Sequence, residues 1–272
     1  MKFSIITVNY NNKEGLRNTI ESVINQTFNN YEFIIIDGGS DDGSVELIKE
    51  YNCQISYWES KKDNGIYHAM NKGIHKATGD YLNFMNSGDC FYNNTVLQRI
   101  SQQIMDIDIL VGKDYHYNNN THKGFSTILP PRLSMLTFYV QTLPHQSTFF
   151  KKSLFNNSLY DEGLHLVSDF KFYIQKICIE NCSTKYTEEI VCKRENDGLS
   201  TQMNELRLHE REKVLSHYLP AGIMKDYDTL SKIDTSSLYK LMHLCETSAT
   251  RRILTLCIKI INKLWKLYTC WH

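Results

Sequence analysis

The fold is decided by residues 3–37, which read FSIITVNYNNKEGLRNTIESVINQTFNNYEFIIID. Short apolar runs at 3–8 and 32–36 are rich in isoleucine, and continuous apolar strands of this kind are typical of parallel sheets covered on both faces. The segment between them, 14–27, carries apolar residues at helical spacing, namely Leu16, Ile20, Val23 and Ile24. The stretch therefore predicts a strand, a crossover helix and a second strand.

The same alternation continues along the chain. A turn at 38–44, GGSDDGS, ends the second strand and leads into a helix, and Asp41 and Asp42 are explained as turn and helix-start residues. Strands at 55–58 and 81–85 enclose a helix at 69–76, which predicts an α/β fold with a mixed, mainly parallel sheet flanked by helices. The later expectations are helices at 95–105 and 168–178, strands at 107–111 and 147–150, a mobile loop at 116–124, and helices at 201–218 and 236–268.

The composition excludes several classes of protein. Lysine plus arginine and aspartate plus glutamate both total 30, so the surface offers no broad attraction for nucleic acid. The eight cysteines form no Cys-x-x-Cys pair and no Cys/His spacing that would hold zinc. The first apolar run ends at Val8, which is too short for a secretion signal or a membrane span. We therefore expect a reduced, cytoplasmic protein.

The turn after the first strand bears on how a nucleotide could bind. It reads NYNNKEG and lacks both the Gly-x-Gly-x-x-Gly loop and the Gly-Lys-Ser/Thr loop, which disfavours a dinucleotide site and a P-loop. A carboxylate that holds a metal ion is the usual substitute for such loops. The candidate is Asp89 in the turn MNSGDCF at 85–91, although a turn of this composition can equally be a turn and nothing more.

Five stretches carry a resemblance to a known family: TVNYNN, IIIDGGSDDGS, DNGIYHAMNKGI, ATGDYLNFMNSGD and SDFKFY. Their order resembles that of the inverting family-2 glycosyltransferases with the GT-A fold, and most closely the branch that builds capsule, exopolysaccharide and O-antigen. The resemblance implies a GT-A domain at 1–200, followed by a helical extension at 201–272. It also implies transfer of a sugar from a nucleotide-diphosphate donor, expected to be UDP-linked, to a hydroxyl of a lipid-linked saccharide with the help of Mn²⁺ or Mg²⁺.

The resemblance also assigns roles to individual residues. Asp89 matches the metal ligand, while Asn86 and Gly88 stand where relatives often have carboxylates, and Asn86 is expected to contact the substrate. Asp169 matches the base that removes the proton of the acceptor hydroxyl. The other expected substrate contacts are Tyr10 and Asp37 at the nucleobase and ribose, Asp63, Asn71, Lys72 and Gly73 at the donor sugar and phosphate, and His145 with Gln146 on the acceptor or phosphate side. His68 stands where many relatives have an acid, and no role is assigned to it.

Plainer explanations stay open at this stage. Asp37 can be a turn or capping acid, and Asp169 can be an acid that is favoured at the start of a helix. A nucleotidyltransferase also combines an α/β sheet with a metal-held diphosphate, but TVNYNN lacks the glycine-rich basic loop of that class. A non-catalytic sugar- or nucleotide-binding protein on a degenerate GT-A fold is the other alternative, because acids are missing at Asn86 and Gly88.

The end of the chain has its own pattern. Residues 251–268, RRILTLCIKIINKLWKLY, set apolar side chains against lysine and arginine, and no acidic residue follows Glu246. A basic amphipathic helix of this kind is predicted to lie on an anionic membrane surface, here the inner face of the cytoplasmic membrane. Packing on the domain itself or on a partner chain in a homo-oligomer is the alternative.

Overall fold

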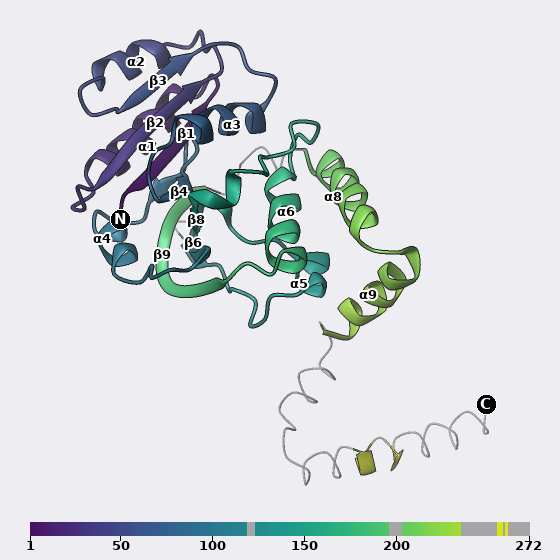
Figure 1. Ribbon diagram of the computed structural model, residues 1–272. Helices are drawn as coiled ribbons and strands as arrows, with labels where there is room; N and C mark the ends of the chain where they lie inside the picture. The colour runs from purple at the N-terminus through teal and green to yellow at the C-terminus, as the bar shows by residue number, and fades with distance from the viewer. Residues whose placement is uncertain (119–122, 196–202, 235–254, 258, 261–272) are drawn as a thin grey trace. The chain divides into compact units, whose positions relative to one another are not determined.

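The structure is a computed structural model that describes residues 1–118, 123–195, 203–234, 255–257 and 259–260. The chain divides into two compact units, Met1–Leu215 and Ser216–His272. The first unit contains the sheet and every side chain predicted to act in the site (Figure 1). Most of the amphipathic segment at 251–268 and of the helix expected at 236–268 lies outside the described residues.

One nine-stranded sheet organises the first unit, in the order β3-β2-β1-β4-β8-β6-β9-β5 with β7 paired to β6. Strands β1 to β4 run parallel, β8 is antiparallel to both of its neighbours, and β6 and β9 are parallel to each other. The strands are β1 Phe3–Asn9, β2 Tyr31–Asp37, β3 Tyr57–Ser60, β4 Tyr81–Phe84, β5 Cys90–Phe91, β6 Ile109–Asn118, β7 Lys123–Ser126, β8 Thr148–Lys151 and β9 Thr184–Glu195. The expected mixed, mainly parallel sheet is confirmed.

Helices cover both faces of this sheet. The α-helices are α1 Lys13–Ile24, α2 Ser44–Glu50, α3 Ile66–Lys76, α4 Val96–Ser101, α5 Met135–Val140, α6 Ser168–Tyr173, α8 Asn204–Tyr218 and α9 Ala221–Asp234. Two 3₁₀ turns, η1 His145–Ser147 and η2 Lys152–Phe155, flank β8, and the π-helix η3 Ile174–Ile179 continues α6. The expected helix at 168–178 is therefore present, with a change to π geometry in its second half.

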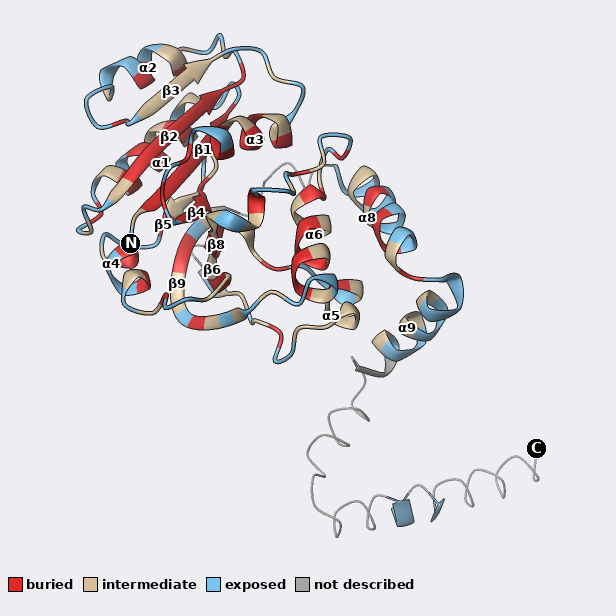
Figure 2. Cartoon of the chain, viewed as in Figure 1, coloured by how far each residue is buried: buried red, intermediate tan, exposed pale blue. Residues whose placement is uncertain are grey.

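The opening strand-helix-strand unit forms as its residues predict. Every residue of β1 is buried, and α1 begins at an Asn12 cap whose side chain accepts a hydrogen bond from the Gly15 amide at 3.2 Å. Figure 2 shows β1 and β2 as the buried centre of the sheet. One face packs against α1, α2 and α4, whereas the other packs against α3, where a Cβ on Gly73 would come within 2.5 Å of Ile6. Only glycine allows that close approach of helix and strand.

Several later expectations were wrong. Within the loop expected at 116–124, residues 116–118 belong to β6 and residues 123 and 124 belong to β7, and these two strands pair antiparallel. Strands β5 and β9 and helices α5 and α9 were not predicted. The sequence of β9, TKYTEEIVCKRE, lacks the continuous apolar run that predicts a strand buried on both faces. In the sheet, β9 lies between β6 and the short strand β5.

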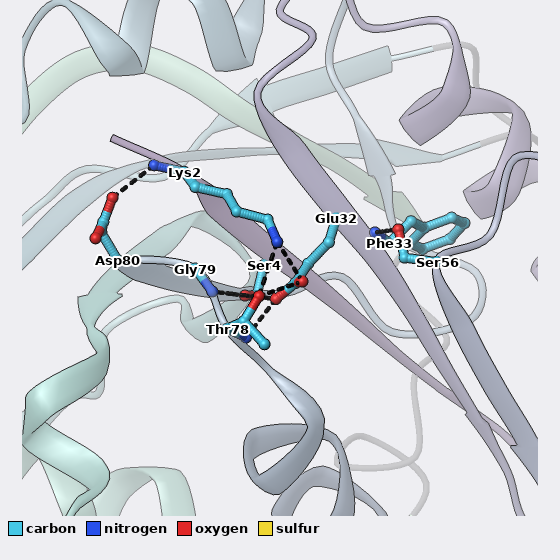
Figure 3. A network of polar contacts seen from close by, with 8 residues as sticks. All are labelled: Lys2, Ser4, Glu32, Phe33, Ser56, Thr78, Gly79 and Asp80. Atoms are coloured by element: carbon cyan, nitrogen blue, oxygen red, sulfur yellow. Dashed lines mark hydrogen bonds and ion pairs between the residues drawn. The ribbon is translucent and has the colours of Figure 1, made fainter.

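At the amino edge of the sheet, a buried carboxylate joins three strands. Glu32 at the start of β2 accepts hydrogen bonds from Ser4 Oγ at 2.5 Å and Thr78 Oγ1 at 2.7 Å, and its other contacts include an ion pair of 2.6 Å with Lys2 (Figure 3). Burial alone would raise the pKa of Glu32, but the contacts with Lys2, Ser4 and Thr78 lower it to about 2. This network fixes the ends of the strands opposite the predicted site.

Candidate active site at the carboxyl edge of the sheet

The predicted site residues gather where the parallel strands end. Because β8 is antiparallel to both β4 and β6, the carboxyl ends of β1 to β4, β6 and β9 lie along one edge, and β8 begins there. This is the edge at which open α/β sheets bind ligands. Tyr10 follows β1, Asp37 ends β2, and Asp89 follows β4.

Asp37 is fully buried and its hydrogen bonds stay within the protein. Its two carboxylate oxygens accept from Asn9 Nδ2, from the Gly39 and Ser40 amides, and from the Ser40 and Ser60 hydroxyls, at 2.6 to 3.1 Å. Burial would raise the pKa of Asp37, but these donors hold it below its usual value. The geometry favours the plainer explanation of Asp37 as an acid that organises the turn, because its lone pairs are already engaged.

Another acid lies beside the exposed aromatic ring of Tyr10. That side chain is 69% exposed, and a Cβ on Gly38 would lie 3.2 Å from its ring and 3.3 Å from Asp63 Oδ2. Gly38 therefore leaves open the space between the ring and the carboxylate. A flat ligand stacked on Tyr10 would meet Asp63 at its edge.

Asp63 is approached by two nitrogen-bearing side chains through only one of its oxygens. Lys72 Nζ and His68 Nδ1 both approach Oδ1, the latter at 3.3 Å, and Lys72 also pairs with Glu59 at 3.4 Å. Burial would lower the pKa of Lys72, but the two carboxylates raise it, so this lysine stays charged. Among the described residues, no hydrogen bond or ion pair reaches Asp63 Oδ2. Lys72 thus holds Asp63, whereas His68, to which the sequence assigned no role, accepts a hydrogen bond from the Asn64 amide at 3.2 Å through the same Nδ1.

Asn71 lies one turn from Tyr67 on α3, and its side chain contacts the loop that precedes α6. It is 3% exposed, and its side chain makes a reciprocal pair with the backbone of Tyr160, at 2.9 and 3.0 Å, and donates to Glu162 at 2.8 Å. These contacts hold the loop that precedes α6. The structure thus places Asn71 as an anchor of that loop.

The turn at 86–89 presents one acid to the site. Thr19 Oγ1 accepts from the Gly88 amide at 3.0 Å and donates to the Asp89 carbonyl at 2.7 Å, and Gly88 has φ of +100°, which favours glycine. Burial raises the pKa of Asp89 to about 6, although positive charge on His145 and Arg194 opposes the rise. The side chain of Asn86 shares this turn, and its Oδ1 is buried without a hydrogen-bond partner.

These two oxygen-bearing groups fit a divalent cation. Within the described ranges, the carboxylate of Asp89 forms no ion pair within 4.0 Å, and its pKa is raised by burial, so a cation bound there would favour the charged form. Mg²⁺ typically takes one or two protein carboxylates and completes its shell with phosphate and water. The described part of the chain contains no cluster of three or more His, Cys, Asp or Glu side chains suited to a metal ion, so any cation would depend on such outside ligands.

Asp169, at the start of α6, stands between two polar partners. The Tyr67 hydroxyl donates to its Oδ1 at 2.8 Å, and His145 Nδ1 lies 3.3 Å from its Oδ2. The other ring nitrogen of His145 lies 3.2 Å from Asn86 Nδ2. A polar chain of Tyr67, Asp169, His145 and Asn86 therefore connects the predicted base with the turn that carries Asp89.

The charges in this chain are coupled. Burial would raise the pKa of Asp169, but His145 and Tyr67 hold it below its usual value. Burial would lower the pKa of His145, but Asp169 and Asp89 raise it. The phenol of Tyr67 stays protonated, since burial and Asp169 place its pKa well above 10. Asp169 is thus an ionised acceptor that points into the site.

The sequence missed several members of the site. Asp114 on β6 is fully buried, accepts from Ser147 Oγ, and lies 3.1 Å from Arg194 Nε on β9. Arg194 escaped notice because β9 was not predicted. Tyr67 was missed because the helix was predicted to begin at residue 69, whereas α3 begins at Ile66 and carries Tyr67 one turn before Asn71. Gln146, which the resemblance did place in the site, is buried, and its side chain contributes a hydrogen bond to Asp89.

The protein is similar to curated relatives over most of its length. It is 29% identical over 208 residues to an uncharacterised glycosyltransferase of Mycobacterium tuberculosis, covering 73% of this chain and 76% of the relative. It is 27% identical, over the same length, to a PGL/p-HBAD biosynthesis glycosyltransferase of Mycobacterium bovis, covering 73% and 78%. Within the described ranges, no helix has the length and apolarity needed to cross a membrane.

Solved structures share the fold at low sequence identity. TarS 1–349 of S. aureus in complex with UDP-GlcNAc superposes with a TM-score of 0.65 at 16% identity, over 92% of this chain and 78% of that one. The longer TarS chain is covered to 46%. The mannosyltransferase PcManGT of Pyrobaculum calidifontis, in complex with GDP-Man and Mn²⁺, gives a TM-score of 0.63 at 12% identity, over 99% and 82%. These neighbours are GT-A glycosyltransferases, and this fold agrees with the sheet and site described above.

The sequence model of the glycosyl transferase family 2 matches residues 4–180, which include β1 through α6 and hence Tyr10, Asp63, Asp89, His145 and Asp169. The protein belongs to glycosyl transferase family 2 and is a glycosyltransferase with a GT-A-like fold.

Proposed function

We propose that this glycosyltransferase moves a sugar from a UDP-linked donor to a hydroxyl of a lipid-linked saccharide, with inversion at the sugar carbon, in the synthesis of a bacterial surface polysaccharide. The observation that carries the proposal is the polar chain from Tyr67 through Asp169 and His145 to Asn86. It joins a carboxylate suited to a base with the turn suited to the donor's diphosphate. A structural neighbour that binds UDP-GlcNAc supports the choice of donor.

The nucleobase would stack on Tyr10. Because the lone pairs of Asp37 are engaged, Asp63 Oδ2 is the acceptor left for an N–H of the base, and uracil presents such an N–H. Lys72 stays charged beside Asp63 and provides a cation on the donor side. We therefore propose that Asp37 acts on the nucleotide indirectly, as the acid that shapes the turn next to Tyr10.

The diphosphate would lie at the turn that carries Asp89. Asp89 and the unpartnered Oδ1 of Asn86 would hold a divalent cation, Mn²⁺ or Mg²⁺, and such a cation offsets the charge of a leaving diphosphate. Together these groups stabilise the charge that develops as the nucleotide departs.

Asp169 would accept the proton of the acceptor hydroxyl while the nucleoside diphosphate leaves from the opposite face of the sugar. Tyr67 donates to one of its oxygens and His145 approaches the other, so both partners fix the direction of the carboxylate. The remaining lone pairs of Asp169 are the ones that could receive the proton. A single displacement of this kind inverts the anomeric centre.

The membrane-facing part of the proposal concerns the chain beyond residue 200. We propose that 201–272 extends the catalytic domain and that its basic segment at 251–268 holds the enzyme at the inner face of the cytoplasmic membrane, where a lipid-linked acceptor is found. A second copy of the chain is the alternative partner for the apolar side of this segment.

Asp169→Asn, compared with Asp89→Ala, tests the proposal. Transfer should fall by about 10²- to 10⁴-fold in Asp169→Asn, because an amide cannot take the proton, while UDP still binds with wild-type affinity. Asp89→Ala should lose UDP affinity as well as transfer. The assay uses UDP-, GDP- and dTDP-sugars with Mn²⁺ or with a chelator, and follows both nucleotide release and the product's anomeric configuration. Near wild-type transfer by Asp169→Asn, or a product with retained configuration, would overturn the assignment of the base.

A further inference from the structure

The position of Asp169 depends on the loop that leads into α6. This loop runs from 156 to 167, and its first half is fastened to α3 through the pair between Asn71 and the Tyr160 backbone. The second half ends two residues before Asp169 and leads the chain into the helix. Whatever fixes the backbone there also fixes the carboxylate.

Glu210 on α8 fixes that backbone. Its side chain is buried, with the residue 5% exposed, and Oε1 and Oε2 accept separate hydrogen bonds from the amides of His165 at 2.7 Å and Leu166 at 2.8 Å. In the part of the chain that the structure describes, Glu210 forms no ion pair. A buried carboxylate without a cation needs strong hydrogen bonds, and the two amides supply them.

Arg211, the next residue, holds α6 from the side. Its guanidinium lies 4.2 Å from the ring centroid of Phe170, the residue directly after Asp169. Its Nη2 also donates to the carbonyls of Phe138, Tyr139 and Gln141 at the carboxyl end of α5, where a positive charge is favoured. Burial lowers the pKa of Arg211 to about 10, as does the charge of Arg207, so Arg211 remains a cation at neutral pH.

We propose that Glu210 and Arg211 are positioning residues that place Asp169 for the transfer step. α8 then completes an active site whose other members, except Arg194, lie within the part matched by the family, which ends at residue 180. The inference rests on the proposed role of Asp169 as the base. It also means that the catalytic unit extends beyond residue 200, where the sequence placed its boundary.

Glu210→Gln and Arg211→Lys test this inference, with Glu212→Gln as the matched control because Glu212 is exposed on the same helix. In Glu210→Gln the carboxamide oxygen can accept from one amide, but its NH₂ group faces the other. Arg211→Lys keeps the charge and loses the planar group that stacks on Phe170. Each variant is measured for kcat of sugar transfer, UDP affinity by calorimetry, melting temperature, and hydrogen exchange of the His165 and Leu166 amides.

We expect kcat to fall about tenfold or more in both variants, since a small misplacement of a catalytic group is costly, while UDP affinity and donor KM stay within about twofold of wild type. Exchange at His165 and Leu166 should speed up in Glu210→Gln, and Glu212→Gln should change nothing. Unchanged kcat, or equal losses of kcat and UDP affinity, would overturn the inference. A wild-type enzyme that transfers no sugar would instead overturn the proposed function. In that case, unchanged hydrogen exchange of the His165 and Leu166 amides in Glu210→Gln would still show that Glu210 does not hold the loop.

Discussion

The hydroxyl of Tyr67 donates a 2.8 Å hydrogen bond to Asp169 although the two residues lie 102 positions apart in the chain. Tyr67 belongs to α3, the helix that also carries Lys72 on the donor side of the site. One rigid helix therefore contacts both the group proposed to bind the donor and the group proposed to receive the acceptor's proton. The distance between the two halves of the reaction is set by the length of that helix.

Tyr67→Phe should reduce transfer without weakening donor binding. Removing the hydroxyl deletes a hydrogen bond to an ionised carboxylate, which is typically worth about 1.5–3 kcal/mol, so we expect kcat to fall about tenfold. The pKa of Asp169 should rise because one of the donors that lower it is lost, and the acidic limb of the pH profile of kcat should move to higher pH. Steady-state kinetics across the acidic range measure both effects.

Tyr51→Phe is the control for this prediction, since the Tyr51 hydroxyl bonds to Glu21 at the surface, away from the site. It should leave kcat and the pH profile unchanged. An unchanged pH profile in Tyr67→Phe would show that the phenol does not act on Asp169.

Substitution of Asp63 should weaken UDP binding, whereas substitution of Asp37 should lower the stability of the protein. Asp63→Asn replaces the proposed acceptor for the base N–H with an amide that can turn its NH₂ group toward it, so UDP affinity should fall about tenfold, while the melting temperature changes little. Asp37→Asn should lower the melting temperature by several degrees, because an amide cannot satisfy the five donors around that position. Calorimetry with UDP and thermal unfolding separate the two. Strong loss of UDP binding in a stable Asp37→Asn protein would restore the direct role that the sequence gave to Asp37.

This contrast also shows how far the sequence could lead. The strand-helix-strand opening was predictable because its apolar residues fall in continuous runs for the strands and at helical spacing for the helix. Ile5 and Ile35, from the two apolar runs, are both fully buried in the sheet. The positions of Asp89 and Asp169 at strand and helix ends followed from the same pattern and from the family motifs. Whether the lone pairs of Asp37 are occupied depends on Ser40 and Ser60, which only the folded turn brings together.

Other features depend on contacts between distant segments. The strand β9 is paired with β6, and its polar sequence gives no continuous apolar run, so Arg194 could not be placed beside Asp114 from the sequence. Glu210 on α8 is a charged residue in a helix of weak amphipathic pattern, and a charged side chain is ordinarily expected at the surface. Its burial follows from the two free amides of the loop before α6, which no local pattern reveals.

The carboxylate of Glu32 should make stability depend on pH. Its pKa is lowered in the folded protein from 4.5 to about 2, so the stabilisation is fully present above the unfolded value and is lost as the pH falls toward the folded value. The shift corresponds to about 3 kcal/mol of the free energy of unfolding between about pH 6 and pH 2. Urea unfolding at several pH values should therefore show a smaller acid-induced loss in Glu32→Gln than in wild type.

The matched control for Glu32 is Glu46→Gln on α2, a residue that is exposed. Its curve of stability against pH should follow that of wild type. Parallel curves for wild type and Glu32→Gln would mean that the contacts with Lys2, Ser4 and Thr78 do not favour the ionised form in the folded state.

The basic segment at 251–268 leads to a prediction about membranes. Its lysines and arginines carry the only formal charges after Glu246, and each cation near an anionic bilayer contributes about 1 kcal/mol of attraction that salt weakens. We expect the full chain to sediment with vesicles that contain phosphatidylserine or phosphatidylglycerol, and high salt to release it. A chain that ends at Glu246 keeps the entire Met1–Leu215 unit and should stay in the supernatant with an unchanged melting temperature.

In a second comparison, exchanging Lys259, Lys263 and Lys266 for glutamine keeps the apolar residues and removes three charges, so it should weaken sedimentation at low salt. Equal sedimentation of the full and shortened chains would reject the segment as the anchor, and a concentration-dependent change of mass that disappears with the segment would assign its apolar side to a second copy of the protein.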